Sequence, residues 1–359
     1  MTSKFFKLLH FSIDPSQPVP DDIKASDWPV LFRIAKEQNI QGIIFHGMNR
    51  LPENCLPDRQ FRMKWFAISR QIAALNTKVN VNAVKVSDIF RQKGLRTCIL
   101  KGQGNALLYP DPLMRTPGDI DIWAEGGYKK VMKTVGKMAE GHKRCYHHID
   151  FPPYGGTDVE LHYRPQFMNN LISNSRLQKY FKKNADAQFA NMVQLPDGAG
   201  SIAVPTAAFN RIYQMAHISN HFFHEGIGLK QLLDYYFVLR QGFTAEEQKA
   251  DAQTLRRCGL YKMSTAVMFV MKKVFCLEDK YLIVEADERL GKYLLNEIMF
   301  AGNFGFYDKR LDKYRGSQIK KNIQRLVRDA RFMMLFPGES LWEPVFRLYH
   351  FFWRKTARY

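Results

Sequence analysis

The feature that most constrains the fold of this chain is a pair of acidic segments in which charged and apolar residues alternate. Residues 119–123 read Asp-Ile-Asp-Ile-Trp, and residues 157–163 read Thr-Asp-Val-Glu-Leu-His-Tyr. Alternate side chains of a β-strand lie on the same face. Each segment therefore predicts a strand with one apolar, buried face and one polar face. Asp119 and Asp121 are expected to lie close together on the polar face.

Carboxylates placed this way predict a bound cation. Two like charges repel unless a positive charge lies between them, and a hard divalent metal ion takes oxygen ligands. Gly118 leaves room for a ligand to approach the backbone next to Asp119. Lys101 and Arg115 precede the acidic strand and supply positive charge for a polyphosphate beside the metal. Glu160, on the second acidic strand, is the expected third carboxylate, although an Asp-x-Asp pattern on an exposed strand also occurs without a metal.

Several short motifs around these strands occur together in a known family. They are Leu-Lys-Gly at 100–102, Tyr-Pro-Asp-Pro at 109–112, Arg115, Gly-Asp-Ile-Asp-Ile at 118–122 and Val-Glu-Leu-His-Tyr-Arg at 159–164. Together they resemble the uncharacterised bacterial nucleotidyltransferases of the DNA polymerase β-like (MNT-type) superfamily. Residues 97–164 carry the resemblance, and a weaker helical match continues to about residue 240.

The resemblance implies a set of site residues. In that superfamily, a glycine turn after the first strand contacts a triphosphate, and carboxylates on two strands bind two Mg²⁺ ions, for which Mn²⁺ can substitute. The implied catalytic and metal-binding residues are Asp119, Asp121 and Glu160. The implied contacts to the phosphates of a nucleoside triphosphate are Lys101, Gly102 and Arg115. This chain departs from the superfamily at the turn, where Lys-Gly-Gln-Gly stands at 101–104 and Gly-Ser is usual.

The function implied by the resemblance is magnesium-dependent nucleotidyl transfer. A nucleoside monophosphate would move from a nucleoside triphosphate to an acceptor hydroxyl, with release of pyrophosphate. The acceptor is open among an RNA 3′ end, a protein side chain and a small molecule. Two alternatives also stay open. One is a non-catalytic nucleotide- or RNA-binding protein on the same fold, and the other is a metal-dependent phosphoesterase that uses Asp119, Asp121, Glu160 and His162.

The pattern of the whole chain predicts an α+β fold, in which a polymerase β-like nucleotidyltransferase core with a small mixed sheet lies between two helical regions. The expected divisions are an N-terminal helical region at 1–93, the α/β core at 94–205 and a C-terminal helical domain with a basic tail at 206–359. The expected strands are 95–100, 119–123, a hairpin of 142–151 and 157–164 around the turn 152–156, and a weaker pair at 191–195 and 201–204.

An apolar stripe before the core predicts one long amphipathic helix. Apolar side chains recur every three or four residues, which places them on one helix face; they are Phe61, Trp65, Ile68, Ile72, Leu75 and Val79. Asn82 lies on the same helix face as this stripe. Packing of this stripe against the α/β core is the preferred interpretation, and a coiled-coil dimer with a buried asparagine is the alternative.

The histidines of the predicted hairpin are further candidates. His162 shares the polar face with Glu160, so it is within reach of the same site as a metal ligand or as a hydrogen-bonding neighbour. His147 and His148 are expected to point to opposite faces, so that at most one of them faces the site.

The C-terminal helical region contains polar residues at helical spacing. His217 and His221 are four residues apart, with Glu225 four further on. Such a histidine pair can bind zinc, but the glutamate inside a zincin helix is absent, and a structural role is preferred. Lys230 and Asp234 are expected to form an ion pair along one helix, and Asp234 is expected to be structural.

The charge balance favours a polyanionic partner. The chain has 53 Lys and Arg against 34 Asp and Glu, a formal net charge of +19. Residues 301–359 are strongly basic, with interleaved aromatic residues. A terminal helix that packs on the core and leaves a basic face in solvent is the preferred interpretation. Contact with a polyanion, either single-stranded nucleic acid or a membrane surface, is the alternative. No apolar run is long enough for a transmembrane segment, and the five cysteines show no C-x-x-C spacing, so a reduced, cytoplasmic protein is expected.

Overall fold

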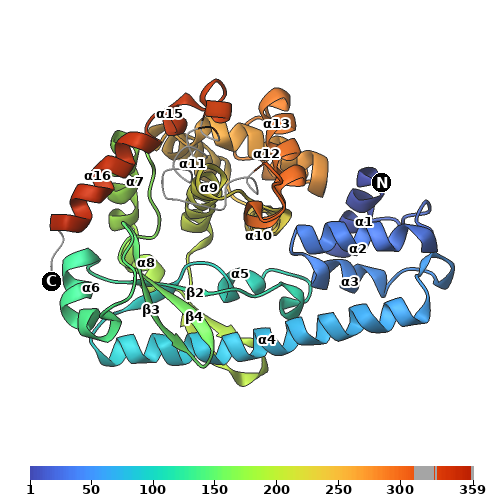
Figure 1. The fold of residues 1–359 in the computed structure, drawn as a ribbon, viewed down its shortest axis with the longest axis horizontal. Coiled ribbons are helices and arrows are strands. Elements are labelled where there is room, and N and C mark those ends of the chain that lie inside the picture. The colour runs from blue at the N-terminus through green and yellow to red at the C-terminus, as the bar shows by residue number, and fades with distance from the viewer. Residues whose placement is uncertain (311–326, 328–329, 357–359) are drawn as a thin grey trace.

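The centre of the fold is a four-stranded mixed sheet, seen in a computed structural model that describes residues 1–310, 327 and 330–356 (Figure 1). The strand order is β1-β2-β4-β3, with β2 parallel to β4 and the two outer strands antiparallel to their neighbours. A separate pair, β5 and β6, forms a second small sheet. The bounds are β1 (Thr97–Ile99), β2 (Ile120–Ala124), β3 (His148–Tyr154), β4 (Thr157–His162), β5 (Met192–Leu195) and β6 (Gly200–Ala203).

Helices surround this sheet, which confirms the predicted α+β fold. The N-terminal helices are α1 (Thr2–Ile13), α2 (Trp28–Glu37), α3 (Gln41–Met48) and α4 (Arg59–Gln92). The helices between the strands are α5 (Gln103–Ala106), α6 (Gly127–Val135), α7 (Leu171–Lys183) and α8 (Ala185–Ala190). The C-terminal helices are α9 (Ala207–His224), α10 (Leu229–Arg240), α11 (Ala245–Arg257), α12 (Tyr261–Phe275), α13 (Glu288–Ala301), α15 (Pro337–Ser340) and α16 (Glu343–Thr356).

The two faces of the four-stranded sheet differ, as the alternation of the sequence predicts. Ile122 in β2 and Leu161 in β4 lie on the apolar face, in one buried cluster with Val86 and Phe90 of α4 and Val131 of α6. The acidic and histidine side chains of the same strands lie on the opposite face. Figure 1 shows α4 running along the sheet on one side, while the C-terminal helices lie on the other side.

The long helix α4 packs within the chain, as the preferred interpretation predicts. The Asp58 side chain caps its first turn by accepting a hydrogen bond of 2.8 Å from the Phe61 backbone N–H. Trp65 packs edge-on against Trp28 in the N-terminal helices. Further along, the Asn82 amide donates to the Tyr154 carbonyl at 3.1 Å and to Thr157 Oγ1 at 2.8 Å. Asn82 therefore joins α4 to the β3–β4 hairpin, and its side-chain amide forms its hydrogen bonds within this chain.

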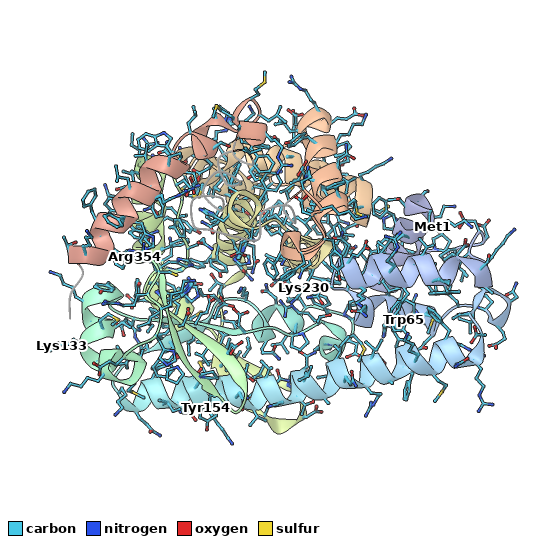
Figure 2. The ribbon with its side chains drawn as sticks, in the orientation of Figure 1. Met1, Trp65, Lys133, Tyr154, Lys230 and Arg354 are labelled. Carbon is cyan, nitrogen blue, oxygen red and sulfur yellow. The ribbon has the colours of Figure 1, made fainter. Side chains whose placement is uncertain are left out.

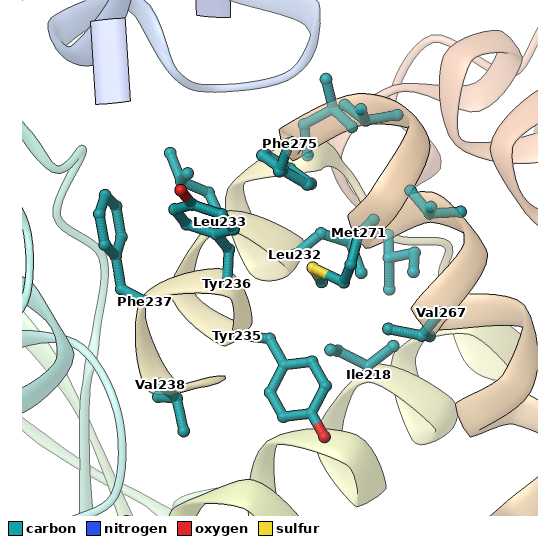
Figure 3. Close-up of a cluster of buried hydrophobic side chains, with 14 of the residues drawn as sticks. Ile218, Leu232, Leu233, Tyr235, Tyr236, Phe237, Val238, Val267, Met271 and Phe275 are labelled. Atoms are coloured by element: carbon teal, nitrogen blue, oxygen red, sulfur yellow. The ribbon is translucent and has the colours of Figure 1, made fainter. Parts of the chain in front are cut away.

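The C-terminal helices enclose the larger hydrophobic core. Figure 3 shows its centre, where α9, α10 and α12 meet. Ile218, Tyr235 and Met271 are all fully buried there. The N-terminal helices join the same core. The Gln38 side chain donates to the Ile298 carbonyl at 3.1 Å, and His10 Nε2 lies 2.5 Å from the Val274 carbonyl oxygen.

The predicted hairpin differs from the observed one at both ends. β3 begins at His148, six residues later than expected, and continues through Pro152 and Pro153 into the expected turn. Prolines lack a backbone N–H, and β3 tolerates them because it is an edge strand with an irregular register between Phe151 and Tyr154. The turn itself is only Gly155-Gly156, both with positive φ.

The end of the described chain packs on the core through aromatic side chains. Phe346 of α16 is buried and stacks on Phe167, with ring centroids 4.6 Å apart, while Trp353 packs edge-on against Tyr128. Much of the predicted basic stretch, including Lys313, Arg315, Lys320, Lys321, Arg325 and Arg328, lies outside the described residues. Among the helices that are described, none has the length and apolar character needed to cross a membrane.

Candidate active site

The parallel pairing of β2 and β4 brings the predicted carboxylates together. Asp121 and Glu160 are direct partners across the two strands, so both project from the polar face. Asp119 immediately precedes β2, which begins at Ile120. The three side chains differ in exposure: Asp121 is 3% exposed, Glu160 is 31% exposed and Asp119 is 35% exposed. One buried and two accessible carboxylates therefore line this part of the sheet.

Lys101 is the nearest cation to the acidic pair. It follows β1, and its Nζ lies 3.0 Å from Asp121 Oδ2 and 3.9 Å from Asp119 Oδ1. Burial alone would lower the pKa of Lys101, but the charges of Asp119 and Asp121 outweigh burial and raise that pKa well above its usual range. Gly102 then turns the chain with φ +65° and ψ −112°, a conformation that side chains disfavour. The Lys-Gly motif thus combines a fixed positive charge with a sharp turn.

His162 faces the same carboxylates from β4. Its Nε2 lies 3.2 Å from Asp121 Oδ1 and 3.3 Å from Glu160 Oε2. Burial would lower the pKa of His162, but the hydrogen bonds to Asp121 and Glu160 outweigh this effect and raise the pKa to about 9. Neighbouring β3 contributes His148, whose Nδ1 is 3.3 Å from Glu160 Oε2 and whose Nε2 is 3.3 Å from Asp150 Oδ1.

The prediction that only one of His147 and His148 faces the site is wrong. His147 Nε2 lies 3.1 Å from His148 Nδ1, and the His147 ring centroid is 5.3 Å from that of His162. Alternation fails here because β3 begins only at His148, so His147 belongs to the preceding loop. Three imidazoles therefore gather beside the carboxylates. Burial and, to a smaller extent, the charges of the neighbouring histidines hold the pKa of His147 well below its usual range.

The side chains of this cluster have the chemistry and spacing of a metal site. One ligand atom each of Asp121, Glu160 and His162 lies within 4.8 Å of the others. Ligands of one ion are separated by at most about twice a metal–ligand bond of 2.0–2.4 Å. Two further groups within the described chain meet the same criterion, one formed by the three imidazoles and one by His148, Asp150 and Glu160. Asp119 belongs to none of the three groups.

Arg115, expected beside phosphate, makes a buried ion pair with the helical region. Its Nε and Nη2 donate to the two carboxylate oxygens of Asp234 at 2.8 and 2.7 Å, and the Tyr109 hydroxyl donates to the same carboxylate at 2.5 Å. The expected ion pair between Lys230 and Asp234 is not found among the described residues. Arg115 Nη1 is buried and has no hydrogen-bond partner in the described part of the chain, so one donor of this guanidinium remains uncommitted.

The helical region contributes a second lysine to the site, which the sequence pattern misses. Lys230 of α10 lies between the C-terminal helices and the sheet (Figure 2), and a Cβ atom added to Gly118 would be 3.9 Å from its Nζ. The side chain is buried, and no carboxylate of the described chain forms an ion pair with it. Burial and the charges of Arg115 and Lys101 outweigh the opposite effects of Asp234 and Asp119 and lower the pKa of Lys230 to about 7.

Helix α9 covers the polar face without joining the metal-binding groups. Phe209 of α9 stacks on Trp123 of β2 with ring centroids 5.8 Å apart, and Trp123 shares the face of Asp121, so α9 lies close to the site. Burial and the charges of His221 and Lys101 hold the pKa of His217 well below its usual range. His221 Nδ1 is 3.0 Å from Glu225 Oε2 along the same helix. Neither histidine belongs to a metal-binding group within the described chain. The position of Lys230 and of these histidines depends on how the helices pack on the sheet.

A small mixed sheet under a cover of helices is consistent with a protein of the nucleotidyltransferase class, and a family model assigns the chain to that class. The chain belongs to a family described as uncharacterised nucleotidyltransferases, whose model matches residues 24–275. This range includes the N-terminal helices from α2 onward, the whole sheet, and the C-terminal helices up to α12. No curated protein and no solved structure matches the chain.

Proposed function

We propose that this protein transfers a nucleoside monophosphate from a nucleoside triphosphate to an acceptor hydroxyl and releases pyrophosphate. Membership of a nucleotidyltransferase family supports nucleotidyl transfer in general. The observation that carries the specific proposal is the convergence of Asp119, Asp121 and Glu160 on the polar face, next to Lys101 and Lys230. Anionic and cationic side chains meet there, as binding of both a metal ion and a polyphosphate requires.

The residues present fit divalent metal ions. Asp121 and Glu160 would hold the metal with carboxylate oxygens, and Asp119, outside that group but accessible, is available as a further ligand. Bound Mg²⁺ or Mn²⁺ would neutralise phosphate charge and lower the pKa of the acceptor hydroxyl. The buried Asp121 is already ionised for this role: burial raises its pKa, but the charge of Lys101 brings the pKa below its usual range.

The chain's own cations would bind and orient the triphosphate. Lys101 lies on the sheet side of the site, and Lys230 lies on the helical side, facing Gly118, where the absence of a side chain leaves room. Two cations on opposite sides hold a polyphosphate in one orientation and stabilise the charge that develops on the leaving pyrophosphate. Glu160 would act as a metal ligand or, in the alternative, as the base that accepts the proton of the acceptor hydroxyl, and its partial exposure fits either role. The reaction thus rests on positioning and electrostatics.

The proposal is tested first by ligand-induced stabilisation. Thermal unfolding is measured with Mg²⁺ and each of the four nucleoside triphosphates, for the wild type and for Asp119→Asn and Asp121→Asn. A ligand that binds only the folded state, present at 100 times its Kd, adds about 2.7 kcal/mol to the free energy of unfolding. We expect a metal-dependent increase with at least one triphosphate in the wild type and a loss of that increase in both variants.

The control is Asp158→Asn, which removes an exposed carboxylate from β4 outside the cluster. It should leave the stabilisation unchanged. Equal stabilisation of wild type and both site variants would contradict the assignment of the acidic strands. Stabilisation without pyrophosphate release, measured with a broad mixture of RNA, protein and small hydroxyl acceptors, would favour a nucleotide-binding protein over a transferase.

A further inference from the structure

We infer that His162 is a direct metal ligand, so that the ion at this site is bound by nitrogen as well as oxygen. The site would therefore bind a first-row transition ion such as Mn²⁺ more tightly than Mg²⁺. This inference rests on the function proposed above, because it concerns the same metal centre, and it assigns a ligand role to a histidine beside the carboxylates.

A single nitrogen atom of His162 lies against two carboxylates. Nε2 of His162 lies 3.2 Å from Asp121 Oδ1 and 3.3 Å from Glu160 Oε2, so it faces both carboxylates at once. One N–H can donate well to only one of two such acceptors. A metal ion bound among the three atoms would instead satisfy all of them, because each supplies a lone pair to the same cation.

Two of the facing side chains are buried. The side chains of His162 and Asp121 are each only 3% exposed, so water has little access to the atoms that face one another. Lone pairs brought together away from water repel unless a proton or a cation lies between them. Without metal, the proton on Nε2 of His162 fills this position, and a bound metal ion would replace that proton. The strands impose this approach, because Asp121 and Glu160 are register partners and His162 follows Glu160 on the same face.

The neighbouring imidazole of His148 lies between two carboxylates. His148, paired with His162 across β3 and β4, directs Nδ1 toward Glu160 at 3.3 Å, while its Nε2 lies 3.3 Å from Asp150. A carboxylate on one ring nitrogen fixes the orientation of the ring and is the usual support of histidines in metal sites. His148 thus orients Glu160 from outside the group formed by Asp121, Glu160 and His162.

The ligand set decides the class of ion. Mg²⁺ takes oxygen ligands in near-octahedral geometry and keeps several waters. Imidazole raises the affinity for first-row transition ions relative to Mg²⁺. Two carboxylates with one imidazole therefore favour Mn²⁺ and the later ions of that row. Tighter binding of Mn²⁺ than of Mg²⁺ is expected in the full chain without nucleotide.

The test uses Mn²⁺ as a spectroscopic probe bound to the full-length protein. Pulsed electron paramagnetic resonance detects coupling between bound Mn²⁺ and a ligating ¹⁴N, and the continuous-wave signal of free Mn²⁺ gives Kd, alone and in competition with Mg²⁺. We expect ¹⁴N coupling in the wild type. We expect His162→Gln to abolish it and to weaken Mn²⁺ binding by about tenfold or more.

Two further variants make the result specific. His162→Asp replaces the nitrogen ligand by oxygen and should lower the ratio of Mn²⁺ to Mg²⁺ affinity while metal binding persists. His142→Gln changes an exposed histidine outside the cluster and should leave coupling and affinity unchanged. Circular dichroism and unfolding midpoints of all variants show whether each is folded.

The outcomes separate this inference from the proposed function. Mn²⁺ binding that depends on Asp121 but shows no ¹⁴N coupling would overturn the inference and leave the transferase proposal standing. Coupling that survives His162→Gln and disappears in His148→Gln would transfer the nitrogen ligand to His148 and also overturn the inference. Absence of both metal binding and triphosphate stabilisation would overturn the inference and the proposed function together.

Discussion

Three cations close to the acidic strands are in different electrostatic situations. Lys101 is ion-paired with Asp121, and Arg115 is ion-paired with Asp234. Lys230 is buried without a carboxylate partner among the described residues, and its pKa is lowered to about 7. The first two therefore keep their charge whether or not a ligand binds. The charge of Lys230 depends on whether an anion is present.

When a phosphate group binds at Lys230, the amine of Lys230 should consequently take up a proton. An anion stabilises the charged amine and raises its pKa, so at pH 8, above the free pKa of about 7, binding protonates Lys230. Triphosphate affinity should fall as the pH rises through that region. Titration calorimetry in buffers of different ionisation enthalpy measures the proton uptake directly.

The control for this prediction is Lys230→Arg, because a guanidinium stays charged over this range. It should bind triphosphate without the proton uptake, while ionisation of the triphosphate itself contributes equally to both proteins. Lys230→Met should weaken binding by about 10- to 100-fold, the usual loss for a charge-assisted hydrogen bond of about 1.5–3 kcal/mol. Identical proton uptake in wild type and Lys230→Arg would rule out Lys230 as the group that titrates.

The site residues fall into two groups by how well the sequence predicts them. Asp119, Asp121 and Glu160 are candidates from strand alternation, because a period of two is a local property of the chain. Lys230 has no such signal, because its role depends on how α10 packs against the sheet, and local spacing pairs it with Asp234 instead. For His147, the prediction depended on a strand boundary, which sequence patterns locate poorly.

At the scale of elements, the long helix was the most predictable part of the fold. An apolar stripe over many turns defines a helix regardless of its partner. The stripe does not predict which of its residues are buried or what they pack against. Leu75 is half exposed, whereas Val79 is buried against the sheet. The hairpin was less predictable, because the prolines that indicate a turn are tolerated in the edge strand β3.

Asn82→Ala should reveal how firmly α4 holds the β3–β4 hairpin. Its amide donates to Tyr154 and Thr157 in a buried setting, and the variant leaves both acceptors without that donor. The expected loss in the free energy of unfolding is about 1–3 kcal/mol, measured by chemical denaturation.

Leu75→Ala is the matched control, because this side chain is on the same helix but 50% exposed. Its effect should stay within about 0.5 kcal/mol, as for other surface substitutions. A loss for Asn82→Ala no larger than for Leu75→Ala would show that the two hydrogen bonds contribute little to stability.

At the scale of the whole molecule, the sequence did not predict which helices share a core. The N-terminal helices and the C-terminal helices meet in one hydrophobic cluster. Hydrogen bonds join Gln38 to Ile298, which is 260 positions later in the chain, and His10 to Val274, which is 264 positions later. Each amphipathic helix indicates that one of its faces is covered, but not by which segment. Only the three-dimensional arrangement supplies that pairing.

The ion pair of Arg115 with Asp234 connects the sheet to the helical cover, and its loss should destabilise the molecule as a whole. Asp234→Asn leaves the buried Arg115 without a counter-charge, which typically costs about 3–5 kcal/mol. Replacing both residues, as Arg115→Met with Asp234→Leu, should cost less because no buried charge remains. Urea unfolding of the three proteins measures the difference.

An exposed pair provides the control for this comparison. Lys272 Nζ lies 2.6 Å from Asp279 Oδ1 on the surface. Asp279→Asn should change the free energy of unfolding only slightly, because solvent screens such pairs. A double variant less stable than Asp234→Asn alone would contradict the expectation that the unpaired charge dominates the loss.

The packing of α1 against α12 has a consequence for how the protein is made. α1 packs on α12, about 260 residues later in the chain. At a synthesis rate of about 5–20 residues per second, roughly 10–50 s pass before a ribosome has added that partner. Until then, the apolar side chains of Phe5 and Leu8, fully buried in the finished protein, lack part of their cover. The newly made α1 segment must therefore be protected until α12 has been synthesised, a requirement that cannot be seen in the completed fold.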